Sequence, residues 1–415
     1  MLALHGCVED PGDEGMGGPP SPPIDVPTTD PCAERIDPEG IASLCVWVAE
    51  EDLGRLYEDP DARIEVGASI TLDGELFEDG EFELHGGAAR SWPKKSYRVR
   101  FDDDKAPYDF FGDGTERHRR LVLQASWIDP TFVRAKTACD LVRELGGLAP
   151  RFNFTRLFIN GELHGLYVVI ERIDDVYLER QGFSATGNLY KAESHDANWA
   201  VRTNPLAGFD EKTDEDGKAE DLAALFEAIS SAPESKEGVE NAVAPLLEIE
   251  DFLLWNLVMS YALNLDTFTK NYYLYHDPMA APGSPGAKFR IIQWDADTTF
   301  GLWWTGARYE DPSKATLFGE KNRFAQKLFA IVDYYGPYLE RFEERLGSEL
   351  EPKAMMGRVG SDLDRIREAT REDMALWERD LVPEDEEAFL MEMLEVRYSA
   401  TLSAIAAAKK GLSPE

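Results

Sequence analysis

Alternating hydrophobic and polar positions mark the first part of the chain after about residue 41. Residues 44–48 form a short apolar run, and residues 63–101 alternate in segments separated by Asp-Gly pairs that favour turns. The stretch 95–101 alternates most regularly, as expected of a strand with one buried face. A hairpin is predicted over 154–170, because Asn160-Gly161 lies between two apolar runs and suits a type I′ turn. This part of the chain is therefore predicted to be rich in strands.

Helical periodicity becomes dominant further along the chain. Apolar side chains recur at helical spacing in three segments, at 131–146, 219–230 and 248–263. The last part, from about 322 to 411, is mainly helical, and we expect interruptions near Gly357-Gly360 and at Pro383. Between the helices lie a polar loop at 203–218 and two short buried strands at 272–276 and 289–294.

Because strands come first and helices later, the pattern predicts an α+β fold with two lobes. We expect a strand-rich N-terminal lobe over 41–175 and a helix-rich C-terminal lobe over 176–412. The preceding residues 1–40 are rich in Pro, Gly, Asp and Glu and show no apolar period. Such a segment cannot bury enough surface to offset its ordering entropy, so it is predicted to be a disordered linker.

The composition narrows the classes of function. The 415 residues include 79 Asp and Glu against 43 Lys and Arg, which gives a formal net charge of −36. A chain this acidic lacks the positive field that non-specific nucleic-acid binding needs, so we expect no nucleic-acid partner. The sequence contains no run of about 18 apolar residues, so no membrane-spanning helix is predicted.

The cysteines bear on localisation. Leu4-His5-Gly6-Cys7 resembles the end of a bacterial lipoprotein signal, although the charged region and most of the apolar region of such a signal are missing. We expect an exported or cell-envelope lipoprotein, tethered to a membrane only through a lipid on Cys7. The alternative is a chance match and a cytoplasmic protein. Cys32 and Cys45 are close in sequence and can form a local disulfide in an oxidising compartment.

The segment 264–301 carries the strongest chemical signal. Asp266 follows an apolar helix and precedes Asn271 by the same spacing as the catalytic loop of protein kinases, and a buried strand then leads into Asp295 and Asp297. Carboxylates at the end of a buried strand are costly unless they are paired, hydrogen-bonded or bound to a cation. Two carboxylates and an amide from neighbouring strands suit Mg²⁺ or Mn²⁺. The alternative is that these side chains only cap turns and accept backbone N–H groups.

Two further clusters contain basic side chains. Lys94 and Lys95 lead into a predicted strand, and a lysine on a strand can neutralise phosphate charge, as it does in kinases. Equally, such a lysine can protect an exposed strand edge from aggregation. In the other cluster, Arg134 follows Trp127 and Asp129, and we expect Arg134 to form an ion pair with Glu171 if these residues are only structural.

Together these motifs resemble the CotH kinase family, the atypical protein kinases similar to spore coat protein H. The resemblance covers about residues 60–400. Its motifs, in chain order, are Pro93-Lys94-Lys95-Ser96-Tyr97-Arg98; Trp127, Asp129 and Arg134; Asn160-Gly161-Glu162-Leu163-His164-Gly165-Leu166-Tyr167 leading to Glu171; Gly187-Asn188-Leu189-Tyr190-Lys191; Asn264, Asp266, Asn271 and Tyr272; and Trp294-Asp295 with Asp297, Thr299, Phe300 and Gly301.

The resemblance implies a divergent kinase-like fold that uses ATP with Mg²⁺ or Mn²⁺ to phosphorylate Ser or Thr of secreted or surface proteins. By motif, Asp266 is the catalytic aspartate, and Asn271, Asp295 and Asp297 hold the metal.

The same resemblance assigns nucleotide binding to Lys94 or Lys95, with Arg134 and Glu171. Two positions depart from the family's usual pattern. Lys270 stands where a His often precedes the Asn of the catalytic loop, and residues 85–90 replace a more usual Arg-Gly followed by small polar residues.

Two alternatives to a kinase stay open. One is a surface adhesion or scaffold protein on a catalytically degenerate kinase fold, and the other is an ATP-using transferase that attaches AMP or glutamate to a protein. For a kinase, the acidic surface is expected to favour protein substrates with basic segments around the acceptor Ser or Thr.

Overall fold

A computed structural model describes residues 30–32, 40–72, 74–101, 110–112, 118–213, 219–309, 311 and 313–412. Cys7 and nearly all of the predicted linker lie outside these residues. The described part is an α+β fold, as predicted, with most strands in the first half and most helices in the second. No helix among the described residues is long and apolar enough to cross a membrane.

The helices and strands have the following bounds. The strands are β1 Ala42–Trp47, β2 Glu65–Leu72, β3 Glu75–His85, β4 Ser96–Arg100, β5 Arg120–Gln124, β6 Phe152–Ile159, β7 Glu162–Glu171, β8 Asn188–Ala192, β9 Phe209–Glu211, β10 Tyr272–His276 and β11 Arg290–Gln293. The α-helices are α1 Glu50–Glu58, α2 Arg134–Glu144, α3 Asp175–Arg180, α4 Glu220–Ser231, α5 Lys236–Ala242, α6 Ile249–Tyr261, α7 Arg323–Phe329, α8 Val332–Leu346, α9 Pro352–Leu376 and α10 Pro383–Leu412.

Strands β1 to β7 form a closed barrel in the order β1-β2-β3-β4-β5-β7-β6. All neighbours are antiparallel except β1 and β6, whose parallel pairing closes the sheet and leaves it without an open edge. The β6–β7 hairpin turns at Asn160-Gly161 as predicted, and both residues have the positive φ that a type I′ turn requires.

A disulfide joins Cys32 to Cys45 on β1, so the predicted local bridge is present.

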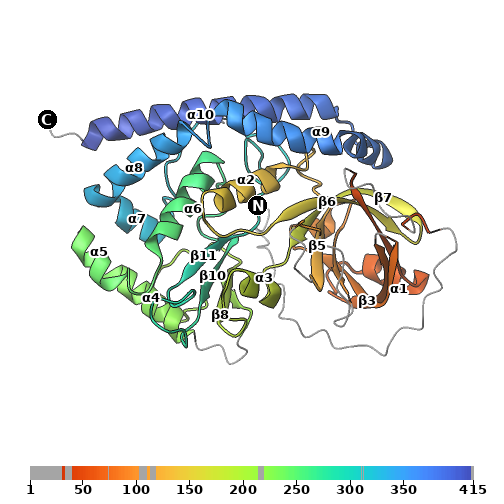
Figure 1. The fold of residues 1–415 in the computed structure, drawn as a ribbon, viewed down its shortest axis with the longest axis horizontal. Coiled ribbons are helices and arrows are strands. Elements are labelled where there is room, and N and C mark those ends of the chain that lie inside the picture. Colours follow the sequence, from red (N-terminus) through yellow and green to blue (C-terminus); the bar gives the residue numbers. More distant parts are fainter. Residues whose placement is uncertain are drawn as a thin grey trace, which may run out of the picture.

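The second half of the molecule is built around a small antiparallel sheet in the order β11-β10-β8-β9. Figure 1 shows this sheet beside the barrel, with α3 between them and the long helices α9 and α10 along one side. The helix α6 packs against α2 and β11, and nearly all of its residues are buried. This burial explains why its sequence is apolar around most of the helix rather than on one face. This packing fixes the end of α6, where the predicted catalytic loop begins.

Two local predictions are wrong. The helix α9 continues through Gly357 and Gly360 instead of breaking there. Each glycine weakens a helix by about 1 kcal/mol, but α9 buries a row of apolar side chains that includes Met355, Val359 and Leu363, and this burial outweighs the cost. The segment 203–218, predicted to be a polar loop, contains the short strand β9, which pairs with β8.

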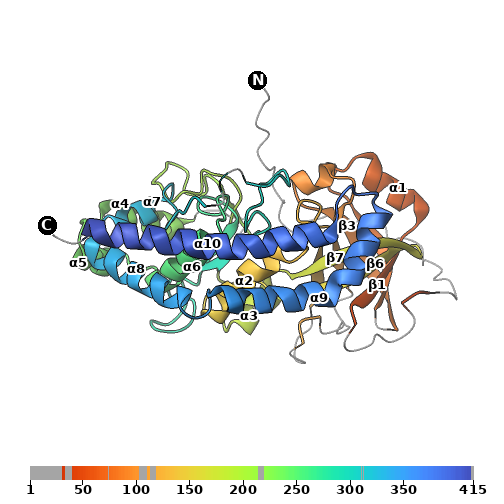
Figure 2. The ribbon, with the colours of Figure 1, turned by 90° about the horizontal axis from the view of Figure 1, so that it is seen from above.

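The helix α9 joins the barrel to the helical half through a buried ion pair. Lys94 is 1% exposed, and its ammonium donates to Asp373 on α9 at 2.5 Å and to the carbonyl oxygen of Leu166 on β7. Asp373 also accepts the N–H of Leu166 at 2.9 Å. Close by, the indole N–H of Trp377 donates to the carbonyl of His164 at 2.9 Å. Figure 2 shows α9 reaching over β6 and β7.

We predict that Lys94→Met lowers the free energy of unfolding by about 3–5 kcal/mol, because the change leaves the Asp373 carboxylate buried without a cation. The double change Lys94→Met with Asp373→Asn should recover most of this loss, since Asn keeps an oxygen for the Leu166 N–H. Lys95→Met is the matched control, because the Lys95 ammonium donates only to a carbonyl, that of Arg90. Urea unfolding measures all three. Equal stability of the Lys94 and Lys95 variants would contradict this account.

The same pair predicts a pH dependence. Burial lowers the pKa of Lys94 to about 8, and the charge of Asp373 opposes this shift only in part. In the unfolded chain the lysine keeps its ordinary pKa, so between pH 8 and about 10.5 the unfolded state binds more protons. The contribution of Lys94 to stability must therefore rise with pH in this window. We expect the unfolding free energy of the wild type, minus that of Lys94→Met, to increase from pH 8 to pH 10; a flat or falling difference would be inconsistent.

Candidate active site

The candidate catalytic loop follows α6 and is held by buried polar side chains. Asn264 is fully buried, and its side-chain oxygen accepts the backbone N–H of Asp266 at 3.2 Å and the hydroxyl of Thr298 at 3.4 Å. The hydroxyl of Thr267 contacts the carbonyl of Asn271 at 3.1 Å and the side-chain oxygen of Gln293, on β11, at 3.3 Å. These bonds tie the loop after α6 to the loop after β11.

Asp266 lies among hydrogen-bond donors. Its carboxylate accepts the side-chain N–H of Asn271 at 3.0 Å and lies 3.0 Å from the ammonium of Lys270. The ring of His195 approaches it at 3.9 Å. The Asp266 side chain is 28% exposed, so its carboxylate can still meet a substrate hydroxyl. The structure therefore brings Asp266 and Asn271 together, as their spacing predicted.

Asp295 and Asp297 follow β11, which pairs with β10 so that Gln293 faces Tyr272, the residue after Asn271. Both carboxyl groups lie within electrostatic reach of Asp266. The pKa of Asp297 is raised well above its ordinary value, first by burial and then by the charge of Asp295 and a hydrogen bond between the two carboxyls. The pKa of Asp295 is raised by burial and by the charge of Asp266. By surface area Asp295 is exposed and Asp297 is half-buried, although many protein atoms surround both carboxyl groups.

This arrangement fits a divalent cation. A pair of carboxyls that share a proton and repel a third carboxylate is stabilised when a hard cation replaces the proton. Among the described residues, the only group of three or more His, Cys, Asp or Glu ligand atoms within 4.8 Å of one another is Asp30, Cys32 and Cys45. The disulfide uses both of those thiols. The ligand oxygens of Asp266, Asp295 and Asp297 therefore do not all lie within 4.8 Å of one another, and the part of the site that could hold one ion is the hydrogen-bonded pair Asp295 and Asp297.

Two lysines near this cluster were not assigned a role from the sequence. The charges of Lys270 and Lys191 both lower the pKa of Asp295, so both lie within electrostatic reach of its carboxyl group. Lys191 is on β8, directly across from Tyr273 on β10, and its ammonium also contacts Glu193 at 2.9 Å. The sequence could not show that Lys191 lies near Asp295, because this depends on how β8 pairs with β10. Its place in the motif Gly187-Asn188-Leu189-Tyr190-Lys191 was the one available signal.

The structure gives Lys94 and Lys95 other partners. Lys94 is held by Asp373 and Leu166, and Lys95 donates to the carbonyl of Arg90 at 2.6 Å while remaining half-buried. Neither lysine is among the main causes of the pKa shifts of Asp295 or Asp297, whereas Lys270 and Lys191 are for Asp295. Contact of either lysine with phosphate stays a prediction, and for Lys94 it would require the buried pair with Asp373 to break.

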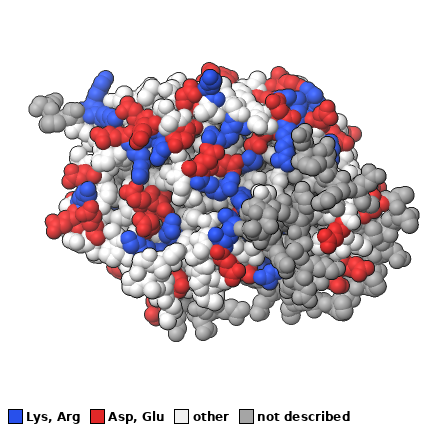
Figure 3. Space-filling view, in the orientation of Figure 1, with Lys and Arg blue, Asp and Glu red and all other residues white. Residues whose placement is uncertain are grey.

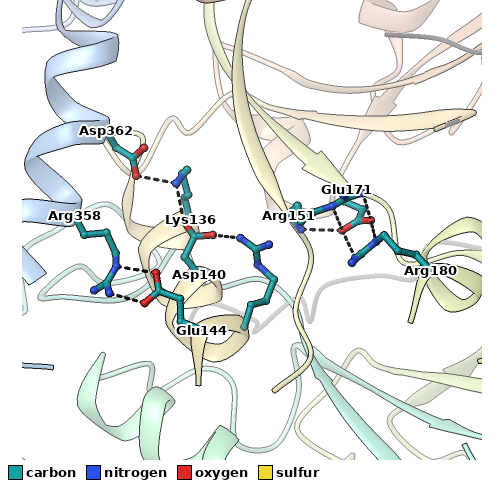
Figure 4. Close-up of polar contacts among 9 residues, drawn as sticks. Lys136, Asp140, Glu144, Arg151, Glu171, Arg180, Arg358 and Asp362 are labelled. Carbon is teal, nitrogen blue, oxygen red and sulfur yellow. Dashed lines mark hydrogen bonds and ion pairs between the residues drawn. The ribbon is translucent and has the colours of Figure 1, made fainter. Parts of the chain in front are cut away.

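Arg134 and Glu171 do not pair with each other, so that prediction is wrong. Arg134 binds Asp129 through its side chain and its backbone N–H, because both residues belong to the first turn of α2 and the loop before it. Glu171 is fully buried and accepts hydrogen bonds from Arg151 and Arg180. Figure 4 shows this triad beside α2.

Arg134 still reaches the aspartate site indirectly. The charge of Asp129, the partner of Arg134, contributes to the raised pKa of Asp297, so Asp129 lies within electrostatic reach of Asp297. The Arg134 side chain is 0% exposed, yet its Nε and Nη2 atoms have no hydrogen-bond partner among the residues that the structure describes. A buried guanidinium with two unused N–H groups is costly without a ligand, which fits a role for Arg134 in anion binding.

The helix α2 connects this region to α9. Lys136 pairs with both Asp140 on its own helix and Asp362 on α9, and Arg358 on α9 binds Glu144, as Figure 4 shows. These partly buried pairs hold α2 against the helical half, although the sequence pattern grouped α2 with the strand-rich part of the chain.

We predict that Asp295→Asn raises the melting temperature of the metal-free protein by about 1–3 °C, because it removes one of the repelling carboxylates. The same change should abolish the stabilisation that Mn²⁺ gives to the wild type. Asp364→Asn on α9 is the control, since Asp364 is 70% exposed and, within the described part of the chain, pairs only with Arg367. Thermal unfolding with and without Mn²⁺ tests this. Retention of the Mn²⁺ response by Asp295→Asn would exclude this residue as a ligand.

Comparison with known proteins agrees with the motifs. Residues 82–400 match the family described as CotH kinase protein, which covers more than half of the chain and every candidate site residue from Lys94 to Asp297. The inner spore coat protein H of Bacillus subtilis (strain 168) is 29% identical over 234 residues, which are 54% of this chain and 59% of that protein. The chain thus aligns with about three-fifths of the length of this relative. On the match over residues 82–400, the chain belongs to the CotH kinase protein family.

Proposed function

We propose that this protein is an ATP- and divalent-metal-dependent protein kinase that phosphorylates Ser or Thr of secreted or surface proteins. The observation that carries the proposal is the site around Asp266. Its carboxylate is 3.0 Å from the Asn271 amide and lies within electrostatic reach of the hydrogen-bonded pair Asp295 and Asp297. In kinases, an aspartate and an asparagine at this spacing take the acceptor proton and hold a metal. The likeness to a kinase fold, with the barrel as N-terminal lobe and the helices as C-terminal lobe, is part of the same proposal.

The residues take distinct roles in this reaction. Asp266 accepts the proton of the acceptor hydroxyl as the bond between its oxygen and the γ-phosphorus forms. The bond from that phosphorus to the β–γ bridging oxygen breaks, and ADP leaves with the electron pair. Asn271, Asp295 and Asp297 would hold Mg²⁺ or Mn²⁺, which neutralises phosphate charge when bound.

Several cations are proposed to contact the nucleotide. Lys191 and Lys270 are proposed to face the phosphates because they already act on Asp295. Arg134, with its unused N–H groups, and Lys95 complete this set. Glu171 would act by holding Arg151 and Arg180 rather than by touching the nucleotide.

Export is part of the proposal. A disulfide between Cys32 and Cys45 is expected of a protein that folds in an oxidising compartment, and this supports a location outside the cytoplasm. A lipid on Cys7 stays a proposal, because Cys7 lies outside the described residues. An exported kinase needs a source of ATP outside the cytoplasm.

We predict that the purified protein transfers labelled phosphate from ATP to protein in the presence of Mn²⁺, and that Asp295→Ala abolishes the transfer. Asp266→Asn should lower kcat by about 100-fold or more, since the proton acceptor is lost while the shape is kept. Asp364→Asn again serves as control. Equal incorporation by the wild type and Asp295→Ala would refute the kinase proposal. Intact mass distinguishes added phosphate from AMP or glutamate, the products of the alternative transferases.

A further inference from the structure

A polar hollow lies beside the candidate catalytic loop. Its volume is about 440 Å³, and its lining includes His195, Thr269, Glu320, Lys321, Arg323 and Gln326. Thr269 is part of the loop between Asp266 and Asn271, whereas Lys321 lies just before α7 and Arg323 is its first residue. The hollow therefore joins the loop after α6 to a segment about 50 residues further along the chain.

One wall of the hollow contacts the candidate proton acceptor. The Nδ1 atom of His195 lies 2.7 Å from the hydroxyl of Thr269, and Nε2 of the same ring lies 3.9 Å from Asp266. His195 is thus shared between the hollow and the carboxylate. A polypeptide whose hydroxyl meets Asp266 would place its neighbouring side chains within reach of this hollow.

The hollow is locally basic. Lys321 and Arg323 are both exposed, and in the described part of the chain neither has a carboxylate within ion-pair distance; the Arg323 guanidinium donates instead to Gln326 at 3.1 Å. Glu320 is the one carboxylate in the lining. The pKa of His195 is lowered by burial and then by the charges of Lys270 and Lys321, which outweigh the opposing effects of Asp266 and Asp196.

This local charge differs from the charge of the whole chain. On the face shown in Figure 3, Lys and Arg side chains are interspersed with Asp and Glu, so the net charge of −36 does not describe every part of the surface. Salt screens exposed charges beyond about 8–10 Å, so a bound side chain responds to the residues around it rather than to the total charge. Unpaired cations at a hollow favour an anion.

We infer that this hollow binds an anionic side chain of the acceptor polypeptide, either a carboxylate or a phosphoserine, next to the hydroxyl that is phosphorylated. The inference rests on the proposed kinase function. It predicts negatively charged substrate residues next to the acceptor hydroxyl, whereas the acidic composition of the chain led us to expect basic substrate segments. Lys321 and Arg323 pair with the anion, and His195 can donate a hydrogen bond to it.

The test compares labelled peptides with one acceptor Ser and flanking Ala, Glu, phosphoserine or Lys. The variants are Lys321→Glu with Arg323→Glu, and a control pair of equal charge change, Lys236→Glu with Lys410→Glu, on α5 and α10, outside the lining of the hollow. We expect kcat/KM of the wild type to be about tenfold higher for the Glu or phosphoserine peptides than for the Lys peptide, and the first variant to reverse this order. The control variant should behave as the wild type. A larger effect of phosphoserine than of Glu would identify a phosphorylated segment as the better ligand.

Binding of the same peptides with Ser replaced by Ala, measured by fluorescence anisotropy in full-length protein, separates this inference from the kinase proposal. If no peptide is phosphorylated but the wild type binds the anionic peptides about tenfold more tightly than the Lys321/Arg323 variant does, the hollow is confirmed and the kinase proposal fails. Equal binding of anionic peptides by the wild type and this variant, or a preference of the wild type for the Lys peptide, would overturn the inference.

Discussion

Repulsion among three aspartates is the constraint on which the site depends. Asp266, Asp295 and Asp297 interact electrostatically where the loop after α6 meets the loop after β11, and the pKa values of the last two are raised, first by burial and then by the neighbouring carboxylates. Such an arrangement costs free energy in the folded chain. The arrangement persists because buried hydrogen bonds to the side chains of Asn264 and Gln293 fix both loops despite the repulsion between the carboxylates. Under the proposed function, a divalent cation would offset this cost on binding.

The rest of the fold holds the two halves of the molecule around this point. The barrel has no open edge, and α9 joins it to the helices through Lys94 and Asp373. The helix α2 is linked to α9 through Lys136 and Arg358, and α2 begins at Arg134, whose partner Asp129 acts on Asp297. Separate ion pairs therefore link the barrel to α9, α9 to α2, and the start of α2 to Asp129.

The features that could be predicted from the sequence are those that depend on the local hydrophobic pattern or on residues a few positions apart. The hairpin at Asn160-Gly161, the strands before Asp295, and the approach of Asn271 to Asp266 all follow from neighbours in the chain. Partners far apart in sequence could not be predicted. The partner of Lys94, Asp373, lies 279 residues away in the sequence, so the motif around Lys94 could not show that its ammonium is held in a buried ion pair. Arg134 and Glu171 were paired by type of charge, whereas the fold gives each a different partner.

A crystal of the protein grown with Mn²⁺ and a non-hydrolysable ATP analogue gives the most direct measurement of the central claim. Manganese scatters anomalously, so its position is read without assumptions about the ligands. The account predicts an anomalous peak within about 2.0–2.3 Å of oxygen atoms of Asp295 and Asp297, with the γ-phosphate on the side of Asp266. A bound nucleotide with manganese at another place, or no anomalous peak at these two aspartates at saturating Mn²⁺, would contradict it.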